Sequence, residues 1–308
     1  MPSLSDIQKR IKSVKNTKQI TKAMEVVSAT KMRKSQDLAL KARPYAFAAF
    51  ELLAATSKKL KVGEKLPALL TENESNKTLA IIIASDKGLA GSLNANVMRK
   101  ALATINELKA AGEVDLVSVG KKGREFFSYR GHSFVKEFVG HGDFVDITEM
   151  NELHDFISAQ FLAGSYGKVV FVYTNFLSTL RQEPVVRQVL PVSQANLNEM
   201  IEGLVPDKGK YSEIRKDTRE EEYEPYLFEP SREEVLGELA DRLFKMELYH
   251  IQLESNASEH SARMVAMKTA SENAEEIVDD LTLIYNKGRQ ARITQEIMEI
   301  TSGSDAVG

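Results

Sequence analysis

The residues of this chain that could take part in chemistry begin with a glycine-containing loop, residues 85–92, which reads Ser-Asp-Lys-Gly-Leu-Ala-Gly-Ser. The loop follows an apolar run and precedes a helical stretch, which is where many α/β folds hold a phosphate. It lacks both the Gly-Lys-Ser/Thr ending of a P-loop and the three-glycine dinucleotide fingerprint. The run Gly-Lys-Lys-Gly at 120–123 fails the same tests. We therefore expect structural turns at both places rather than nucleotide sites.

The other reactive side chains form no recognisable catalytic or metal-binding set. The five histidines lack the spacing of metal ligands, and the chain has no cysteine. Paired carboxylates such as Glu275 and Glu276 lie on an acidic helical stretch, where they usually form a solvated face. The sequence therefore predicts no catalytic residue, no cofactor and no metal in this chain. The histidines are His132, His141, His154, His250 and His260.

The composition is that of a globular protein whose charge is unevenly distributed. Of the 308 residues 43% are hydrophobic and 28% charged, and no run approaches the roughly 20 apolar residues of a membrane span. Early charged residues leave no room for a secretory apolar region, so we expect a protein that faces the cytosol. Residues 1–61 carry 14 Lys and Arg against 4 Asp and Glu, whereas 212–308 carry 11 against 22. The two ends are electrostatically complementary.

A long helix is predicted near the C-terminus. From Ser231 to Thr301 there is no proline, and only Gly237 and Gly288 weaken a helix. Ser231 is a candidate N-cap, and Gly303 is expected to mark the end. A heptad frame predicts a seam that packs against a partner helix in a left-handed supercoil. The seam consists of Leu239, Leu243, Met246, His250, Leu253, Ala257, His260, Met264, Met267, Ser271, Ala274, Val278, Leu281 and Tyr285.

A second long amphipathic helix is predicted at the N-terminus, from Ser3 to about Leu60, with a kink or break near Pro44. Because this helix is basic and the C-terminal helix acidic, we expect the two to pack together within one molecule. A coiled-coil homodimer stays open from the residues alone. A basic arm that binds nucleic acid is disfavoured, because the Lys and Arg residues do not cluster with aromatic residues. The apolar stripe consists of Leu4, Ile7, Ile11, Val14, Ile20, Met24 and Val27.

Between the two helices the sequence alternates between strand and helix patterns. This alternation predicts a mostly parallel sheet in a Rossmann-like α/β domain. A charged, glycine-punctuated stretch at 196–224 indicates a linker or insertion. The predicted strands are 79–84, 114–119, 169–173 and 185–192, and the predicted helices are 93–111, 121–129 and 147–162.

Both ends of the chain carry specific sequence motifs. At the front the motifs are Ile11, 14–17 (Val-Lys-Asn-Thr), 20–27 (Ile-Thr-Lys-Ala-Met-Glu-Val-Val) and 31–32 (Lys-Met). At the back they are 262–264 (Ala-Arg-Met), 266–267 (Ala-Met), 285–286 (Tyr-Asn), 289–291 (Arg-Gln-Ala) and 293–296 (Ile-Thr-Gln-Glu). In their order and spacing these motifs resemble the gamma subunit family of F-type rotary ATP synthases, and the resemblance covers most of the chain. Residues 85–94 are similar to the family's first strand-to-helix loop, with Lys87 and Ala90 where arginine and cysteine are common.

The resemblance implies that the end helices form an antiparallel left-handed coiled coil, the shaft inside a hexamer of alternating alpha and beta subunits. The α/β domain would meet the epsilon subunit and the membrane c-ring. This division gives a shaft helix at 1–61, an α/β domain at 77–193, a charged linker and foot segment at 194–230 and a second shaft helix at 231–303. The chain would then be a non-catalytic peripheral subunit at the cytoplasmic face of the cell membrane, touching the membrane only through the c-ring.

The family also implies which residues meet partners. Arg289, Gln290 and Thr294 would contact a loop of beta, and Met24 would lie near the moving C-terminal domain of beta. The segment 223–230 (Tyr-Glu-Pro-Tyr-Leu-Phe-Glu-Pro) resembles the ring-facing segment. One alternative of another class stays open: a nucleotide- or phosphate-binding α/β module with a coiled-coil dimerisation arm. The expected contact residues are Met24, Lys87, Tyr223, Glu224, Arg289, Gln290, Thr294 and Glu296.

Overall fold

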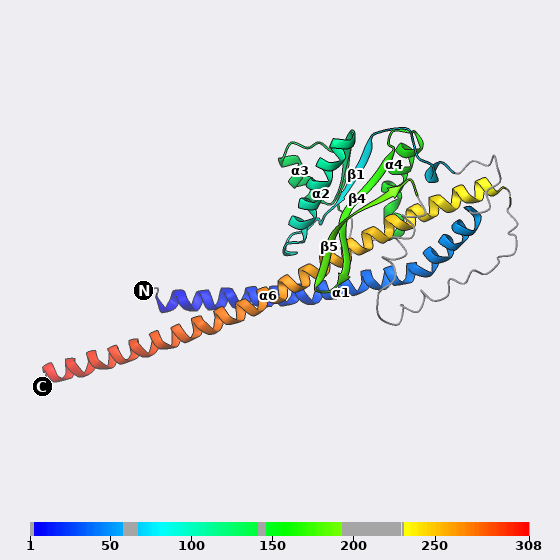
Figure 1. Ribbon diagram of the computed structural model, residues 1–308. Coiled ribbons are helices and arrows are strands. Elements are labelled where there is room, and N and C mark those ends of the chain that lie inside the picture. The colour runs from blue at the N-terminus through cyan, green and yellow to red at the C-terminus, as the bar shows by residue number, and fades with distance from the viewer. Residues whose placement is uncertain (1–2, 58–66, 141–145, 193–228, 230, 308) are drawn as a thin grey trace. The chain divides into compact units, whose positions relative to one another are not determined.

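The computed structural model describes residues 3–57, 67–140, 146–192, 229 and 231–307 (Figure 1). The chain divides into two compact units: a helical unit of residues 1–29 and 263–308, and a sheet unit of residues 30–262. Two long helices, α1 (Leu4–Ser57) and α6 (Arg232–Val307), each contribute to both units. No described helix contains an apolar stretch long enough to cross a bilayer.

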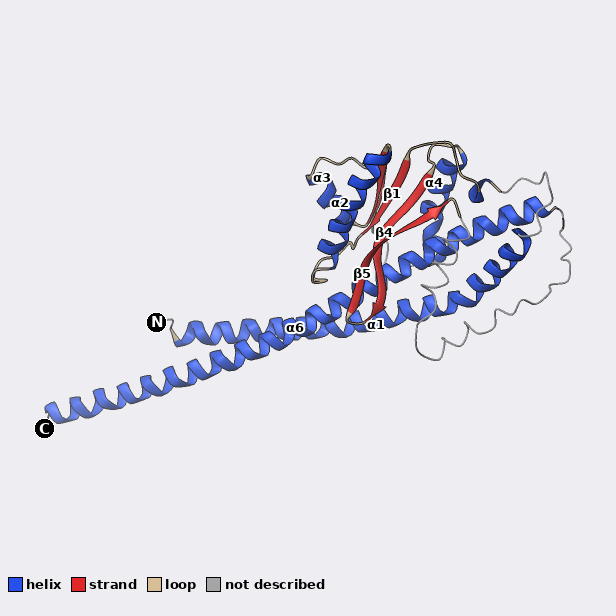
Figure 2. Ribbon diagram, in the orientation of Figure 1, coloured by secondary structure: helices blue, strands red, loops and turns tan. Residues whose placement is uncertain are grey.

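The sheet unit is built on five strands in the order β3-β2-β1-β4-β5 (Figure 2). Strands β1 to β4 run parallel to their neighbours, and β5 pairs antiparallel with β4. The predicted, mostly parallel sheet is confirmed, but the sequence reading missed β3. This strand has three residues, of which only Phe138 is buried, so it carries almost no apolar signal. The strands are β1 (Thr78–Ile83), β2 (Val114–Val119), β3 (Lys136–Phe138), β4 (Lys168–Ser178) and β5 (Arg181–Leu190).

Helices cover both faces of this sheet, which explains why β1 is buried along its whole length. On one face α2 (Leu93–Ala111) and α3 (Lys121–Tyr129) pack on alternate residues of β1, such as Ile82. On the other face α4 (Asn151–Leu162) and the first part of α6 pack on the intervening residues, such as Ile81. Two short 3-10 helices, η1 (Ala68–Leu70) and η2 (Ile147–Met150), precede β1 and α4. Two apolar layers therefore enclose the sheet.

The first part of α6 is a core helix of the sheet unit. Its side chains from Met246 to Ser258 are all buried, so a seam on one face does not describe this stretch. A helix that is buried on all sides packs against several elements at once. Here the partners are the sheet, α4 and α1, since Met246 and Leu253 also contact a cluster that includes Leu38.

The expected ends of the long helices are partly confirmed. The hydroxyl of Ser231 accepts a hydrogen bond from the amide of Glu234 at 3.2 Å, as an N-cap residue does. Gly303 does not end the helix, because α6 continues to Val307. Nor does Pro44 break α1, which continues to Ser57, while the last residues of the expected helix, 58–60, lie outside the described residues. A proline inside a helix removes one backbone donor and crowds the preceding turn, which a long helix can accommodate by bending.

Candidate partner-contact surfaces

In the helical unit, α1 presents a narrow seam with heptad spacing. Ile7, Thr21 and Ser28 are buried, and the residues between them at intervals of three and four are half-buried. The apolar stripe expected from the sequence is therefore wrong at Ile20 and Val27, which are exposed, whereas Met24 is half-buried. Thr21, rather than Ile20, lies in the seam. Its hydroxyl donates to the backbone carbonyl oxygen of Lys18 at 3.0 Å, so its burial leaves this donor satisfied.

Helix α6 presents the matching seam. Met267, Ser271, Ala274 and Val278 are buried at the same spacing, as the heptad frame predicts for this part of the helix. Because most seam residues are small, the two helices can approach closely.

Two contacts between the helices define their pairing. A Cβ atom placed on Gly288 would lie 2.9 Å from Cδ2 of Leu4, and Lys18 Nζ lies 2.8 Å from Oε1 of Glu275. The residue later in α1 thus meets the residue earlier in α6.

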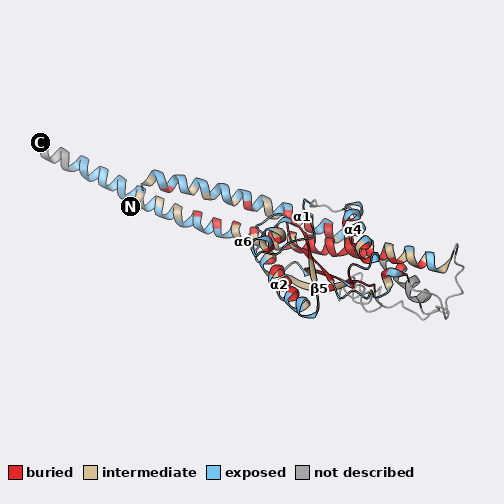
Figure 3. Cartoon of the chain, turned by 90° about the horizontal axis from the view of Figure 1, so that it is seen from above, coloured by how far each residue is buried: buried red, intermediate tan, exposed pale blue. Residues whose placement is uncertain are grey.

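Large apolar side chains face outward from this helical unit. Ile20 is 61% exposed and Ile300 is 72% exposed. Figure 3 shows α6 mostly buried in its first part and exposed toward its C-terminal end. Exposed apolar residues in this number mark a surface that binds another protein. The outward residues of the unit are Ile20, Val26, Val27, Ile277, Leu283, Ile284, Ile293, Ile297, Met298 and Ile300.

The expected contact residues of α6 lie on this exposed part of the helix. Gln290 and Thr294 share one row, because the Thr294 hydroxyl donates to the Gln290 carbonyl oxygen at 3.0 Å. Arg289 lies on a neighbouring row, where it lines a cavity of about 410 Å³ together with Leu4 of α1. Glu296 lines the same cavity and forms an ion pair with Arg292, in which Oε1 of Glu296 lies 2.9 Å from Nε of Arg292.

Met24 is half-buried on α1, between the seam and the exposed apolar residues. Tyr223 and Glu224 lie outside the described residues. The structure therefore places Arg289, Gln290, Thr294 and Glu296 within one short stretch of α6.

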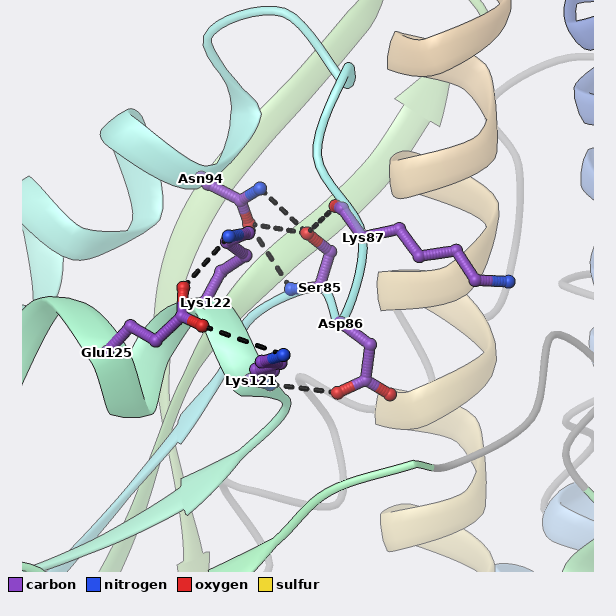
Figure 4. Close-up of polar contacts among 7 residues, drawn as sticks. All are labelled: Ser85, Asp86, Lys87, Asn94, Lys121, Lys122 and Glu125. Carbon is purple, nitrogen blue, oxygen red and sulfur yellow. Dashed lines mark hydrogen bonds and ion pairs between the residues drawn. The ribbon is translucent and has the colours of Figure 1, made fainter.

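The loop after β1 is an ordered turn (Figure 4). The Ser85 hydroxyl donates to the Lys87 carbonyl oxygen at 2.6 Å, and the Asn94 side chain accepts from the Ser85 amide at 3.2 Å. Leu89 and Gly91 have φ values of 64° and 57°. Lys87 is exposed, as a partner contact would require.

Asp86 caps the N-terminus of α3, the helix that begins within the Gly-Lys-Lys-Gly run. Its Oδ1 accepts from the backbone amide of Lys121, the first residue of α3, at 2.8 Å, and its Oδ2 accepts from the Gly140 amide at 3.1 Å. Helix N-termini bind anions because their first amides have no intrahelical partner. Here a side-chain carboxylate already fills that role, which supports a structural turn.

A cavity of about 480 Å³ lies beside this loop, between the carboxyl ends of the parallel strands and α6. Lys87, Lys121 and Arg124 line it from the sheet side, and Glu259 and His260 line it from α6. Cations and two carboxylates, those of Asp86 and Glu259, share this lining, so it lacks the single sign of charge that concentrates an anionic ligand. In the described residues no group of three His, Asp or Glu side chains could hold a metal ion.

Sequence reasoning missed a buried polar cluster in which α6 meets β4. The Glu254 carboxylate accepts a hydrogen bond from the Tyr173 hydroxyl at 2.9 Å and lies 3.0 Å from Nε2 of His250. The heptad frame places His250 in a packing seam instead. The signal was present, because His250 and Glu254 are four residues apart and so adjacent on a helix.

The comparisons with known proteins agree with the terminal motifs. The sequence model of the family described as ATP synthase matches residues 3–307. Among curated relatives, the ATP synthase gamma chain of Chlorobaculum parvum is 38% identical and that of Pelotomaculum thermopropionicum is 39% identical; each alignment covers 100% of this chain and at least 99% of the relative. The chain belongs to the ATP synthase gamma chain family.

Solved structures show that these proteins share the fold. The chain is similar to a chain of the Euglena gracilis mitochondrial ATP synthase (OSCP/F1/c-ring), with a TM-score of 0.60 at 14% identity over 99% of this chain and 94% of that one. It is also similar to a chain of the Tetrahymena thermophila mitochondrial ATP synthase central stalk and c-ring, with a TM-score of 0.56 at 24% identity over 82% of this chain and 99% of that one. At these identities the likeness concerns the fold alone.

Proposed function

We propose that the chain is the central rotor shaft of an F-type ATP synthase and that it couples rotation of a membrane c-ring to ATP synthesis or hydrolysis at the beta subunits. Family membership gives the general function. The observation that carries the mechanical role is the helical unit, two long paired helices whose outer faces expose large apolar residues. Such a surface is suited to the inside of a protein hexamer.

In this proposal the end helices form an antiparallel left-handed coiled coil. Two observations support it: the heptad spacing of buried residues on both helices, and the order of the Leu4–Gly288 and Lys18–Glu275 contacts. A seven-residue repeat favours a left-handed supercoil because a straight helix drifts by about 20° per heptad.

The shaft acts by making the three beta subunits unequal. An asymmetric rod contacts each of them differently and stabilises a different conformation in each, so turning the rod shifts populations at distant nucleotide sites. Arg289, Gln290 and Thr294 would grip a loop of beta, and Met24 would lie near its moving domain. Arg289 suits this role, because a guanidinium can hold a carboxylate with two hydrogen bonds.

The sheet unit would connect the shaft to the membrane part of the complex. Its proposed partners are the epsilon subunit and the c-ring, with Tyr223 and Glu224 in the ring-facing segment and Lys87 at a further contact. The chain would work at the cytoplasmic face of the cell membrane as a peripheral subunit, without a cofactor or a nucleic acid. The placement of Asp86 disfavours the alternative of a phosphate-binding module.

Reconstitution tests this function. The purified chain should hydrolyse no ATP, whereas a complex assembled from it with alpha and beta subunits should. ATP hydrolysis by the chain alone, with a turnover on the order of 1 per second, would contradict the proposal, since that is an ordinary enzyme rate. Recovery of the chain from its source cells without alpha and beta subunits, identified by mass, would contradict it independently.

A further inference from the structure

A charged polar cluster lies in the contact between α6 and the sheet, where apolar side chains and a second polar contact, from the Ser258 hydroxyl to the Thr174 carbonyl oxygen at 3.1 Å, are also found. Glu254 of α6 is 6% exposed. One of its carboxylate oxygens accepts from the hydroxyl of Tyr173, on β4, at 2.9 Å, and the other lies 3.0 Å from Nε2 of His250, one turn earlier on α6. The guanidinium of Arg187, on β5, lies 5.6 Å from the centre of the Tyr173 ring. The cluster therefore joins α6 to two strands.

Glu254 is the ionised acceptor and Tyr173 the protonated donor of their hydrogen bond. Burial alone would raise the pKa of Glu254, but His250, Arg187 and the Tyr173 hydroxyl together lower it below its ordinary value. Burial and the Glu254 charge raise the pKa of Tyr173, so the phenol stays protonated and can donate. An ionised acceptor and a neutral donor make a strong, short-range hydrogen bond.

Most of the other contacts on this face are apolar and less selective. Leu243, Phe244, Leu248 and Ile251 of α6 belong to the cluster that covers this face of the sheet. Apolar burial is roughly proportional to area and has no preferred direction. If α6 turned by one residue, about 100° around its axis, it could still bury apolar area, but the Glu254 charge would lose Tyr173 while remaining out of water. The Glu254 contact, which is the charged one, therefore favours the observed rotational setting of α6.

We propose that Glu254 is a positioning residue that locks the rotational setting of α6 against the sheet, so that torque passes between the sheet unit and the continuous helix α6. This inference rests on the proposed shaft function. Helix α6 is well placed for the task, because it runs without a break from the sheet unit into the helical unit. In some proteins a buried polar or ionic group selects one register among several apolar packings.

The test uses the full complex in lipid vesicles and measures ATP-driven ion transport per ATP hydrolysed. Glu254→Gln removes the charge at constant size, and Tyr173→Phe removes only the hydroxyl. Tyr166→Phe is the matched control. The Tyr166 hydroxyl also donates to a carboxylate, that of Asp115, at 2.8 Å. This bond joins the residue two positions before β4 to β2 and does not involve α6.

We expect Glu254→Gln and Tyr173→Phe to lower the transport ratio while ATP hydrolysis continues, because α6 slips under load. Hydrogen exchange of the α6 amides should quicken by roughly five- to a hundred-fold, the factor expected when a buried partner is lost. Tyr166→Phe should leave the transport ratio at the parent value.

Three results would overturn the inference. One is a parental transport ratio in both α6-contact variants, and another is a fall of equal size in Tyr166→Phe. The third is faster hydrogen exchange of the α6 amides with no change in the transport ratio. That pattern would mean that the contact stabilises the fold but does not help to transmit torque. Failure of the proposed function would look different, since the parent chain itself would then support neither hydrolysis nor transport.

Discussion

Asp86 shows how one side chain can decide between a structural turn and a ligand site. It joins the loop after β1 to the start of α3 and to the backbone after β3. Asp86→Ala should lower the free energy of unfolding by about 1–2 kcal/mol, because two backbone amides lose their acceptor. Asp86→Asn should cost less, since its remaining oxygen still accepts one bond. Denaturant unfolding of the purified chain measures both.

Exposed Glu107 of α2 provides the control for Asp86. Surface substitutions of this kind usually change stability by less than about 0.5 kcal/mol. If Asp86→Ala is no more destabilising than Glu107→Ala, the loop does not depend on this carboxylate.

Glu254 should give the chain a distinct response to acid. A carboxyl whose pKa is lowered on folding stabilises the folded state fully above its ordinary value of 4.5, and this stabilisation is lost as the pH falls through the lower folded-state pKa. The groups that face it are His250, Arg187 and Tyr173, and Glu247 in turn raises the pKa of Tyr173. Unfolding followed between about pH 6 and pH 3 should therefore show a shallower acid dependence in Glu254→Gln than in the parent. Parallel curves would mean that Glu254 titrates alike in both states.

At the residue level, the sequence predicted well where local rules suffice. Ser231 caps its helix as expected, because capping depends on neighbouring residues only. The spacing of His250 and Glu254 indicates that they are neighbours on the helix, but the contact of Glu254 with Tyr173, 81 positions away in the chain, could not be deduced. The charge of Glu254 likewise follows from tertiary neighbours.

At the level of elements, the pairing of α1 with α6 leads to a direct cross-linking experiment. The parent has no cysteine, and Leu4 lies against Gly288. A chain with Leu4→Cys and Gly288→Cys should form a disulfide within one molecule, because Cβ atoms must come within about 3.5–4.5 Å for such a bond. Electrophoresis without reductant measures it as a monomer of altered mobility.

A displaced pair serves as the control for this cross-link. Cysteines at Leu4 and Glu275 should not react, because the structure places Glu275 beside Lys18 instead. Cross-links found only between molecules would favour the homodimer and contradict the paired shaft.

The predicted apolar stripe of α1 failed for a reason that lies in the partner helix. The sequence offers Ile20 and Val27 as continuations of the stripe, yet both are exposed, while Thr21 and Ser28 are buried. Apolar spacing identifies a seam only where all apolar residues face inward. A helix that binds partners on its outer face carries apolar residues on two sides, so the stripe alone cannot tell which side faces its own chain.

At the level of the whole molecule, the α/β core and the long helices could be predicted because their periodic patterns are local. Two features could not. The three-residue strand β3 depends on pairing with β2, and the burial of α6 on all sides depends on which elements surround it. The terminal motifs gave the family, which periodicity and composition alone could not have provided.

The last prediction concerns the grip of the shaft on beta. Arg289 and Gln290 are exposed near the end of α6, on neighbouring rows of one helix. Losing an arginine from a desolvated charged contact typically costs about 2–5 kcal/mol, so part of that energy can appear in the rotational barrier. Arg289→Ala combined with Gln290→Ala should slow ATP turnover of the assembled complex about ten-fold or more. The purified chain should keep its helix content by circular dichroism.

Glu272→Ala is the matched control for this double substitution. Glu272 is also exposed on α6 and makes only a long surface pair with Lys268, at 3.9 Å, a kind of contact that contributes about 0–1 kcal/mol. Its complex should turn over ATP at close to the parental rate. If the double variant assembles and works no worse than Glu272→Ala, the grip on beta lies elsewhere on the exposed apolar face. In that case Ile297, Met298 and Ile300 would be the next residues to replace, because they are the most exposed of the large apolar side chains near the same end of α6.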